Sequence, residues 1–422
     1  MRPFPPLPDW VTLEHQVQKI LTEQEIHGWR FDELAAWQLA SALRKELEET
    51  HQLLRNRHPF VFKSEFTPKR NNATTGYVEG ATFTRIVELN PSSRDHIAWI
   101  LKEKYGWKPT ELTPTGKPII DENVLNKIGS ETSTQFLKCL TVTKMLGMIS
   151  EGTNAWLKLV TNSRIHHHCS VATNTHRCAH RNPNLGQVPA NNDFRKLFIP
   201  SPGQVLVGAD LSGIELRMLA NLLSPYDEGR YAEILLNGDI HQVNADKIGI
   251  SRREVKTISY AIIYGASDTR IGYSFDPTLN DRKAKSKGKE IREAFVSAID
   301  GLAELLAAIK KASAKGHIKS IDGRKILVDS PHKALNYCLQ SGAGVVAKRW
   351  MVINDKRIKQ EGLRCNQLAF IHDELQFECH PEHAKFLSTS LVQSAERAGE
   401  YYNIRLPIEA EAVIGNNWAE TH

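Results

Sequence analysis

Two aspartates occupy positions where strands are expected to end. Asp210 follows the apolar run QVLVGA and precedes the helix-forming run IELRMLANLL, whereas Asp373 lies in the turn of FIHDELQFE between two apolar segments. If these segments share one sheet, both carboxylates face the same point, and paired carboxylates suit magnesium because this hard cation prefers oxygen ligands. Taken singly, each aspartate is more simply explained as the residue that terminates its strand.

A second group of side chains recurs at intervals of four residues. Arg252, Lys256, Tyr260 and Tyr264 in RREVKTISYAIIYG would project within an arc of about 120° on a helix. The two cations suit phosphate oxygens, and the two rings suit stacking on a base and sugar. A solvated basic helix end followed by core tyrosines would show the same pattern. Beside two candidate metal-binding aspartates, the arrangement favours a nucleoside triphosphate as the ligand.

Several elements must form if these side chains are to meet. Apolar periodicity and helix-forming composition predict helices over residues 12–56, 135–159, 213–223, 251–264, 291–312 and 334–360. Period-two patterns and turn residues predict a strand over 204–209, a hairpin over 318–328, and a second hairpin formed by NQLAFI and ELQFEC. Polar composition predicts an irregular basic insertion over 58–88 and a lysine-rich connection over 268–290. Helices therefore dominate the first third, and distant later segments assemble an antiparallel sheet, which makes the fold class α+β.

The composition is that of an ordinary globular protein with a mild basic excess. The 422 residues carry 54 Lys and Arg against 48 Asp and Glu, with 24% charged and 41% hydrophobic residues, which fits a polyanionic partner without demanding one. Six cysteines without a CxxC pair indicate free thiols in a reducing compartment. The segment MRPFPPLPDW lacks the apolar run of a signal peptide, and no stretch approaches the roughly 18 apolar residues of a membrane span. A cytoplasmic protein with no membrane partner is expected.

Three motifs in this chain resemble those of a known family. DLSGIELR, RREVKTISYAIIYG and IHDE are similar to motifs A, B and C of family A DNA polymerases, the bacterial polymerase I group, and occur in the same order. NPSSRDHI, NGDIH, DGRK and SPHKALNYCLQSGAG resemble in particular the replicative polymerases of short-tailed lytic phages. The resemblance covers nearly the whole chain. It implies a right-hand architecture in which a mostly helical thumb and fingers surround an antiparallel palm sheet.

The resemblance also implies boundaries for these parts. The thumb would span residues 1–160, with a short insertion at about 58–88, and the fingers would span 222–326. The palm would be assembled from residues 161–221 and 327–422.

The resemblance also implies a catalytic metal site with a neighbouring primer contact. Asp210 and Asp373 would hold two Mg²⁺ ions, for which Mn²⁺ could substitute, together with the backbone carbonyl of Leu211. Glu374 would support the site as a further catalytic residue, and His372 would lie beside the primer end.

Other residues would bind the incoming deoxynucleoside triphosphate. Arg252, His241 and the catalytic Lys256 would contact its phosphates. Tyr260 would meet its sugar, and Tyr264 would lie where the templating base enters.

The remaining assignments concern sugar selection and primer-template DNA. Glu215 would stand beneath the 2′ carbon of the sugar, and Arg177 would read the minor groove of the primer-terminal base pair. Asn184 would contact the duplex nearby, whereas Asn336 and Gln340 would contact the template side.

The sequence departs from the family in three places. His176 stands where the family usually has glycine in a Thr-Gly-Arg motif, so a different local loop is expected. Few residues precede the thumb-like helices, so a 3′–5′ exonuclease domain is not expected, and a separate exonuclease or processivity factor would be a partner. The short 58–88 insertion puts a thioredoxin partner in doubt.

Histidine and cysteine are concentrated between residues 166 and 180, in types that could bind zinc. The residues are His166, His167, His168, Cys169, His176, Cys178 and His180. Their spacing fits no standard zinc finger, and Arg177 lies among them. A strand and loop near bound DNA is the favoured interpretation, with zinc as the alternative.

The expected function is template-directed DNA synthesis in phage replication, by two-metal nucleotidyl transfer. A single-subunit RNA polymerase is disfavoured because it would lack the sugar gate that Glu215 and Glu374 indicate. A two-metal nuclease would not need the stripe from Arg252 to Tyr264. A degenerate DNA-binding clamp would not need the intact aspartates Asp210 and Asp373.

Overall fold

The computed structural model describes residues 6–109, 111–189, 191–276 and 279–422. The first five residues of the N-terminal segment, and Pro277 and Thr278 of the predicted lysine-rich connection, lie outside the described residues. The chain divides into two units, a larger one formed by Met1–Glu33 and Leu159–His422 and a smaller one formed by Leu34–Lys158. Helices combined with antiparallel strands confirm the predicted α+β class.

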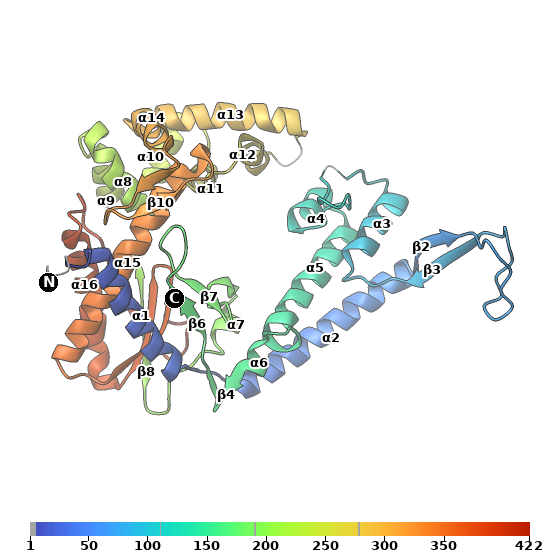
Figure 1. Cartoon of the computed structure of the whole chain (residues 1–422), viewed down its shortest axis with the longest axis horizontal. Helices are drawn as coiled ribbons and strands as arrows, with labels where there is room; N and C mark the ends of the chain where they lie inside the picture. Colours follow the sequence, from blue (N-terminus) through green and yellow to red (C-terminus); the bar gives the residue numbers. More distant parts are fainter. Residues whose placement is uncertain (1–5, 110, 190, 277–278) are drawn as a thin grey trace, which may run out of the picture. The chain divides into compact units, whose positions relative to one another are not determined.

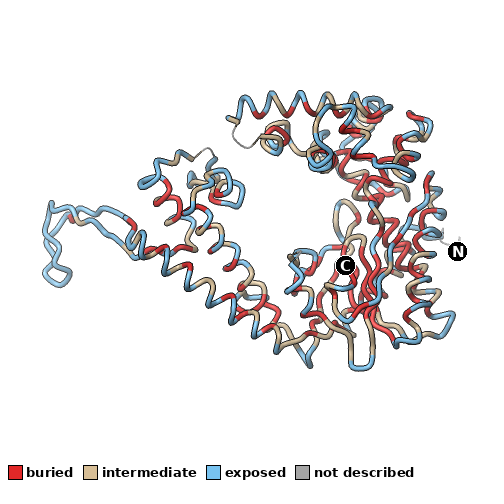
Figure 2. The backbone as a smooth tube through the Cα atoms, turned by 180° about the vertical axis from the view of Figure 1, so that it is seen from behind, coloured by how far each residue is buried: buried red, intermediate tan, exposed pale blue. Residues whose placement is uncertain are grey.

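A four-stranded antiparallel sheet lies at the centre of the larger unit, with the strand order β11-β12-β8-β13. Its strands are β8 (Val205–Leu211), β11 (Cys365–Ile371), β12 (Glu374–Cys379) and β13 (Ala410–Gly415). The predicted strand at 204–209 and the predicted β11–β12 hairpin are confirmed. All six residues of β12 are buried because this strand has neighbours on both sides, and Figure 2 shows the buried positions in red.

Long helices pack against this sheet and against one another. They are α1 (Asp9–His27), α8 (Ile214–Asp227), α15 (Ala334–Gln360) and α16 (Pro381–Tyr401). α1 packs against β11 and α15, while α16 packs against β8, β13 and α15 (Figure 1). The ammonium group of the fully buried Lys348 on α15 lies 2.8 Å from a carboxylate oxygen of Glu14 on α1.

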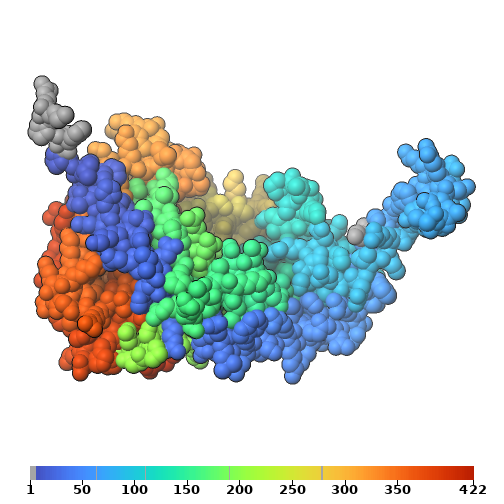
Figure 3. Space-filling model, turned by 60° about the horizontal axis from the view of Figure 1, so that its bottom comes forward, coloured from blue at the N-terminus to red at the C-terminus, as the bar shows by residue number. Residues whose placement is uncertain are grey.

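The first helix therefore belongs to the larger unit. Figure 3 shows it in dark blue on the surface, against the orange C-terminal half. The segment 1–160, expected to form one part, is thus divided between the two units at Glu33 and Leu34.

Short antiparallel pairs complete the sheet structure of the larger unit. One sheet has the order β1 (Trp29–Arg30), β5 (Arg164–Ile165), β4 (Val160–Thr161). The remaining pairs are β6 (His168–Ser170) with β7 (Ala179–Arg181), and β9 (His317–Lys319) with β10 (Lys325–Leu327). The β9–β10 pair confirms the hairpin predicted around Asp322 and Gly323.

A helical layer lies between β8 and β9 along the chain. Its helices after α8 are α9 (Arg230–Asn237), α10 (Ile240–Ile248), α11 (Arg252–Ile263), α12 (Asp268–Phe275), α13 (Asp281–Ala298) and α14 (Leu302–Ser313). The connection predicted over 268–290 was wrong, because this stretch forms α12 and most of α13. The helix predicted over 291–312 is interrupted at Gly301, whose φ of 77° lies in the left-handed region.

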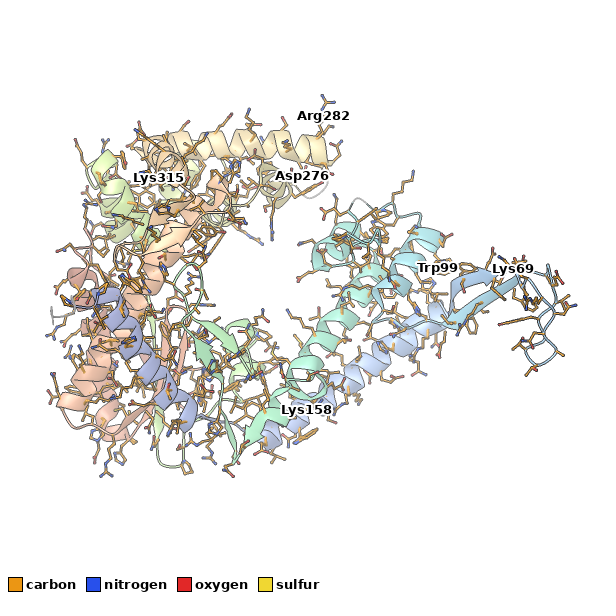
Figure 4. All side chains as sticks on the ribbon, viewed as in Figure 1. Lys69, Trp99, Lys158, Asp276, Arg282 and Lys315 are labelled. Atoms are coloured by element: carbon orange, nitrogen blue, oxygen red, sulfur yellow. The ribbon has the colours of Figure 1, made fainter. Side chains whose placement is uncertain are left out.

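Two glycines explain why α12 and α13 pack closely. A Cβ atom at Gly272 would collide with the carbonyl of Ala284, and one at Gly288 would collide with the carbonyl of Asp268. The side chains of Ser267 and Asn280 cap the N-termini of α12 and α13. These caps favour helix formation even though the segment has a polar composition. Figure 4 shows Asp276 and Arg282 at the same end of this helix pair.

The smaller unit has its own apolar core among helices. Its elements are most of α2 (Glu33–Arg57), α3 (Arg94–Tyr105), α4 (Glu122–Ile128), α5 (Glu131–Leu146), a π-helical turn (Gly147–Glu151) and most of α6 (Trp156–Leu159). The single helix predicted over 12–56 is broken between α1 and α2, where Gly28 adopts a φ of 68° and β1 begins.

The predicted irregular insertion over 58–88 instead forms a hairpin. β2 (Phe60–Phe66) pairs with β3 (Phe83–Glu88), and the ring of Tyr77 lies 5.4 Å from Phe66 and 5.0 Å from Phe83. The hairpin is mostly exposed in Figure 2, and Figure 4 places Lys69 beside its strands. Within the described ranges, no helix combines the length and apolar character needed to cross a bilayer.

The α12–α13 contact gives a stability prediction. Gly288→Ala should destabilise this helix pair by about 1–3 kcal/mol, because the added methyl group forces the two backbones apart. Hydrogen exchange of the α12 and α13 amides and denaturant unfolding would measure the loss.

Gly147→Ala is the matched control, because Gly147 is helical and nothing lies within 4 Å of its added Cβ. This variant should be neutral or slightly stabilised. Native exchange protection of α12 and α13 in Gly288→Ala would contradict the packing argument.

Candidate active site

The central sheet brings the two predicted aspartates to one edge. Asp210 is an exposed position of β8 between the buried residues Ala209 and Leu211, and its register partner on β12 is Glu374, the residue after Asp373. The backbone N–H of Leu211 donates to the carbonyl of Asp373 over 3.0 Å. His372 lies in the tight turn between β11 and β12, where its φ of 61° is in the left-handed region. The structure thus brings together Asp210, Leu211, Asp373 and Glu374 of the predicted metal site, with His372 beside them.

The electrostatic environment of this edge is unfavourable for bare carboxylates. Burial first, and then the charges of Asp373 and Glu374, raise the pKa of Asp210 to about 7. Burial and the charge of Glu215 raise the pKa of Asp373 to about 6, although the charge of Arg177 acts in the opposite direction. Among the ion pairs of the described residues, neither aspartate has a partner. An all-oxygen donor set without a direct ion-pair partner fits a divalent metal.

Glu374 is held by its neighbours. One carboxylate oxygen accepts from Trp418 Nε1 over 2.6 Å and from Gln376 Nε2 over 2.7 Å. The other lies 2.9 Å from His422 Nδ1. A buried carboxylate anchored in this way is suited to supporting the edge of the sheet.

A cavity of about 190 Å³ opens at this edge. Besides the acidic residues and His372, it is lined by Arg195, Trp418 and His422. The guanidinium of Arg195, at the end of α7 (Asn192–Arg195), lies 5.3 Å from the Trp418 ring centroid. The sequence analysis missed these three residues, because no spacing connects them to Asp210 and only the fold places them beside it.

The predicted cationic and aromatic stripe lies on α11. Ser251 and Glu254 start the helix with a reciprocal capping box. The helix ends at Ile263, so Tyr264 lies just beyond it, but its N–H still donates to the carbonyl of Tyr260 over 2.8 Å. The two tyrosine rings are stacked with their centroids 6.4 Å apart.

The NGDIH segment meets this helix. The ring of His241 lies 6.1 Å from that of Tyr260, and Arg252 Nε lies 2.5 Å from a carboxylate oxygen of Asp239. Asp239 also caps α10 by accepting from the backbone N–H of His241. The sequence analysis missed Asp239, although its position two residues before a predicted phosphate-binding histidine could have indicated it.

Two residues from distant motifs meet at Glu215. One of its carboxylate oxygens accepts from Arg177 over 2.5 Å and from the hydroxyl of Tyr264 over 2.8 Å. Since the charge of Glu215 also contributes to the raised pKa of Asp373, this group lies within electrostatic reach of the aspartate pair. The predicted sugar and template residues are therefore connected with the predicted metal site.

The other residues predicted to contact DNA are less closely connected to the aspartate pair. Asn184 caps the short 3₁₀ turn Leu185–Gln187 by accepting from Gly186 N–H. Asn336 and Gln340 lie one turn apart on α15, and the Asn336 amide nitrogen is buried without a hydrogen-bond partner among the described residues. No hydrogen bond within the described ranges joins Asn336 or Gln340 to the aspartate pair.

The candidate zinc residues separate into different environments. His167, Cys169 and His180 converge, with Cys169 Sγ 3.2 Å from His180 Nδ1. The amide nitrogen of Gln24 lies 3.1 Å from His167 Nε2 and 3.6 Å from Cys169 Sγ. Burial raises the pKa of Cys169 to about 12 and lowers those of His167 and His180 to about 3 and 4. These contacts favour an uncharged hydrogen-bonded cluster over a zinc site.

Comparison with known proteins agrees with this geometry. The sequence model described as "DNA polymerase family A" matches residues 64–420. This chain belongs to DNA polymerase family A.

Individual family members were also found. The DNA-directed DNA polymerases of Enterobacteria phage T3 and Escherichia phage T7 are 34% and 33% identical to this chain. Each alignment covers 83% of this chain and 55% of the relative, so the chain spans about half the length of these relatives.

A solved family structure has the same fold. The POL domain of Pol1 from M. smegmatis, in a complex with DNA primer-template and dNTP, superimposes with a TM-score of 0.76 at 22% identity. The alignment covers 96% of this chain and 70% of that one. The similarity confirms the predicted polymerase architecture for this member of family A.

The histidine cluster gives a pH prediction. His167 has a pKa lowered by burial, so the unfolded chain binds more protons than the folded chain below about pH 6.5. The contribution of the neutral His167 to the free energy of unfolding is fully present above that pH and is lost as the pH falls toward 3. His167→Gln keeps an amide nitrogen near the Nε2 position but cannot acquire a charge. Denaturant unfolding between pH 7 and 4 should therefore show a shallower loss of stability in this variant than in the native chain.

Chelation provides the control for this interpretation. Treatment with a zinc chelator at pH 7 should leave the melting temperature of the native chain unchanged. A large decrease, restored by zinc, would favour the metal site, and equal acid sensitivity of both proteins would contradict the role of His167.

Proposed function

We propose that this chain is a DNA-directed DNA polymerase that adds deoxynucleotides to a primer 3′-OH on a DNA template. The observation that carries the proposal is the Asp210–Asp373 edge within electrostatic reach of the Arg177–Glu215–Tyr264 group. The phage T3 and T7 relatives bear this activity in their names, and the Pol1 neighbour was solved with primer-template and dNTP. These relatives also support a role in phage DNA replication inside the host cell.

In this proposal the sheet is the palm, Leu34–Lys158 forms most of the thumb, and residues 222–326 form the fingers. The two aspartates and the Leu211 carbonyl would hold two Mg²⁺ ions, with Mn²⁺ as a substitute. When bound, these ions would favour ionisation of the attacking hydroxyl and stabilise charge on the leaving pyrophosphate. The raised pKa values of both aspartates support this role, because a bound cation would relieve the repulsion between them.

Residues of α10 and α11 would bind the triphosphate. Arg252 is engaged by Asp239, and phosphate oxygens would compete with that carboxylate for the guanidinium. Lys256 lies one turn further along the helix, so it would meet the next phosphate. Burial lowers the pKa of His241, which makes this residue a neutral hydrogen-bond donor at pH 7. These groups would orient the phosphates and stabilise the charge that develops on them.

Residues between the aspartates and the fingers would select the nucleotide. Glu215 would occupy the space below the 2′ carbon, where its engagement by Arg177 and Tyr264 limits its movement. His372 would lie beside the primer end, and Glu374 would hold the sheet edge through Trp418 and Gln376. Asn184, Asn336 and Gln340 would contact DNA.

One assay separates this proposal from its rivals. A labelled primer on a template, incubated with deoxyribonucleotides or ribonucleotides, should be lengthened only with the former. Extension with ribonucleotides would indicate an RNA polymerase, shortening of the primer would indicate a nuclease, and binding without any change would indicate a clamp.

Removing one carboxylate charge should abolish synthesis. Asp210→Asn and Asp373→Asn should each reduce extension by at least about a thousandfold, because each loses several kcal/mol of transition-state stabilisation. DNA affinity, measured by fluorescence anisotropy, should remain near the native value because the shape is preserved.

Asp355→Asn is the control, since Asp355 pairs with Lys359 on α15 and does not line the cavity. Its extension rate should be native. Substantial extension by either site variant in Mg²⁺ would reject the assignment of these aspartates.

Tyr260 should determine the response to dideoxynucleotides. Its ring is half-buried, and among the described residues its hydroxyl has no hydrogen-bond partner. The hydroxyl could take the place of the missing 3′-OH of a dideoxynucleotide, whereas phenylalanine would leave polar groups unsatisfied. That loss is about 1–3 kcal/mol, or about tenfold to a hundredfold in selectivity.

The native chain should therefore accept dideoxynucleotides almost as well as deoxynucleotides, and Tyr260→Phe should reject them. Single-turnover incorporation of both substrates by both proteins would measure the ratio. Strong rejection by the native chain, or an unchanged ratio in the variant, would refute this role.

A further inference from the structure

His176 adopts a backbone conformation that a residue with a side chain rarely occupies. Its φ of 60° lies in the left-handed region, where a residue other than glycine is held at a cost of about 1–3 kcal/mol unless its surroundings impose it. The residue that follows is Arg177, whose guanidinium pairs with Glu215. The surroundings of His176 must therefore stabilise this conformation.

The imidazole of His176 is held by two serines from other elements. Its Nδ1 atom lies 2.7 Å from the hydroxyl oxygen of Ser341, a fully buried residue of α15. That hydroxyl lies 2.7 Å from the hydroxyl of Ser320, directly after β9. Burial lowers the pKa of His176 to about 4, so the ring is uncharged at pH 7. A chain of neutral hydrogen bonds thus joins this loop to α15 and to the β9–β10 hairpin.

The same loop is held at other points. The side chain of Asn174 donates to the Leu327 carbonyl over 2.9 Å and accepts from the Leu327 N–H over 3.1 Å, which joins the loop to β10. The Thr173 hydroxyl donates to the Arg177 carbonyl over 2.6 Å.

α15 also approaches this loop closely. A Cβ atom added at Gly344 would lie 3.2 Å from Arg177 Cγ and 3.3 Å from the His176 carbonyl. The backbone that bears Arg177 is therefore confined between β10 and α15.

We propose that His176 is a positioning residue for Arg177: it fastens the loop to α15, so that the guanidinium is presented in one orientation. This inference rests on the proposed function, in which Arg177 donates to the minor-groove edge of the primer-terminal base pair. An arginine side chain carries about 2 kcal/mol of rotamer entropy. Because the backbone of Arg177 is already fixed, only its side chain has to be ordered when it binds the primer end. His176 itself touches neither the primer nor the nucleotide, and its effect passes through Arg177.

The test compares primers that end in guanine with primers that end in 3-deazaguanine, which lacks the N3 acceptor of the minor groove. In single-turnover extension, the native chain should extend the 3-deaza primer about tenfold more slowly, because a hydrogen bond to a charged donor is lost. Arg177→Ala should remove this difference, since no donor remains to detect the acceptor.

Three variants isolate His176. His176→Gly relaxes the backbone but removes the bond to Ser341, and Ser341→Ala removes the same bond from the opposite side. Both should reduce the tenfold difference to about threefold or less, as expected if roughly half of the interaction energy is lost. His176→Asn should retain it, because asparagine tolerates a positive φ and its amide nitrogen occupies a position equivalent to Nδ1. Denaturant unfolding of each variant measures its stability independently.

The outcomes distinguish this inference from the proposed function. If the native chain extends no primer, the proposed function fails and this inference fails with it. If the native chain extends primers and Arg177→Ala removes the 3-deaza difference, an unchanged difference in His176→Gly and Ser341→Ala overturns the positioning role alone. A uniform slowing of both primers, which leaves the ratio intact, would show that His176 contributes only to stability. If Arg177→Ala keeps the native ratio of the two extension rates, the inference is also overturned, because Arg177 would then not bind the N3 acceptor of the primer end.

Discussion

The antiparallel pairing of β8 with β12 places Asp210 opposite Glu374, and much of the site depends on that register. Side chains alternate between the two faces of a strand, so a slip of one residue would turn Asp210 to the other face of the sheet. The register is held because β8 is bordered by β12 and β13 and its apolar side chains are buried. The same pairing places the β11–β12 turn, with Asp373, next to the N–H of Leu211.

This arrangement concentrates negative charge that the folded chain alone compensates only in part. Burial is the first cause of the raised pKa values of both aspartates, and nearby carboxylates add to it. Such a site is unfavourable for folding unless a ligand supplies positive charge. Glu374 avoids the same conflict because Trp418 and Gln376 donate to it. The different partners of adjacent carboxylates thus give them different chemical roles.

The helices around the sheet contribute rigidity through a few long-range contacts. Lys348 of α15 is fully buried and paired with Glu14 of α1, although more than three hundred residues separate them. α15 also carries Ser341, which contacts His176, so one helix supports both the N-terminal helix and the loop before Arg177. The long helix therefore acts as a common support for segments that enter the site from different parts of the chain.

Local patterns were sufficient for much of this protein. The helix over 334–360, the Asp322-Gly323 hairpin and the β11–β12 hairpin were all predicted, because periodicity and turn chemistry act over a few residues. The family motifs also predicted that Asp210, Asp373 and the α11 stripe belong to one site. Polar composition was misleading at 58–88 and 268–290, where strand pairing and close helix contact at Gly272 and Gly288 decide the structure.

Other features depend on contacts between residues that are distant in sequence. Arg195, Trp418 and His422 reach the cavity only because separate segments meet at one sheet edge, and no local pattern records that meeting. The engagement of Glu215 by Arg177 and Tyr264 likewise joins three separate motifs. The sequence by itself determined most of the elements and the chemical types at the site, because these follow from short-range forces. The tertiary structure alone decided which partners each charge meets, because burial and charge proximity arise only when the chain is folded.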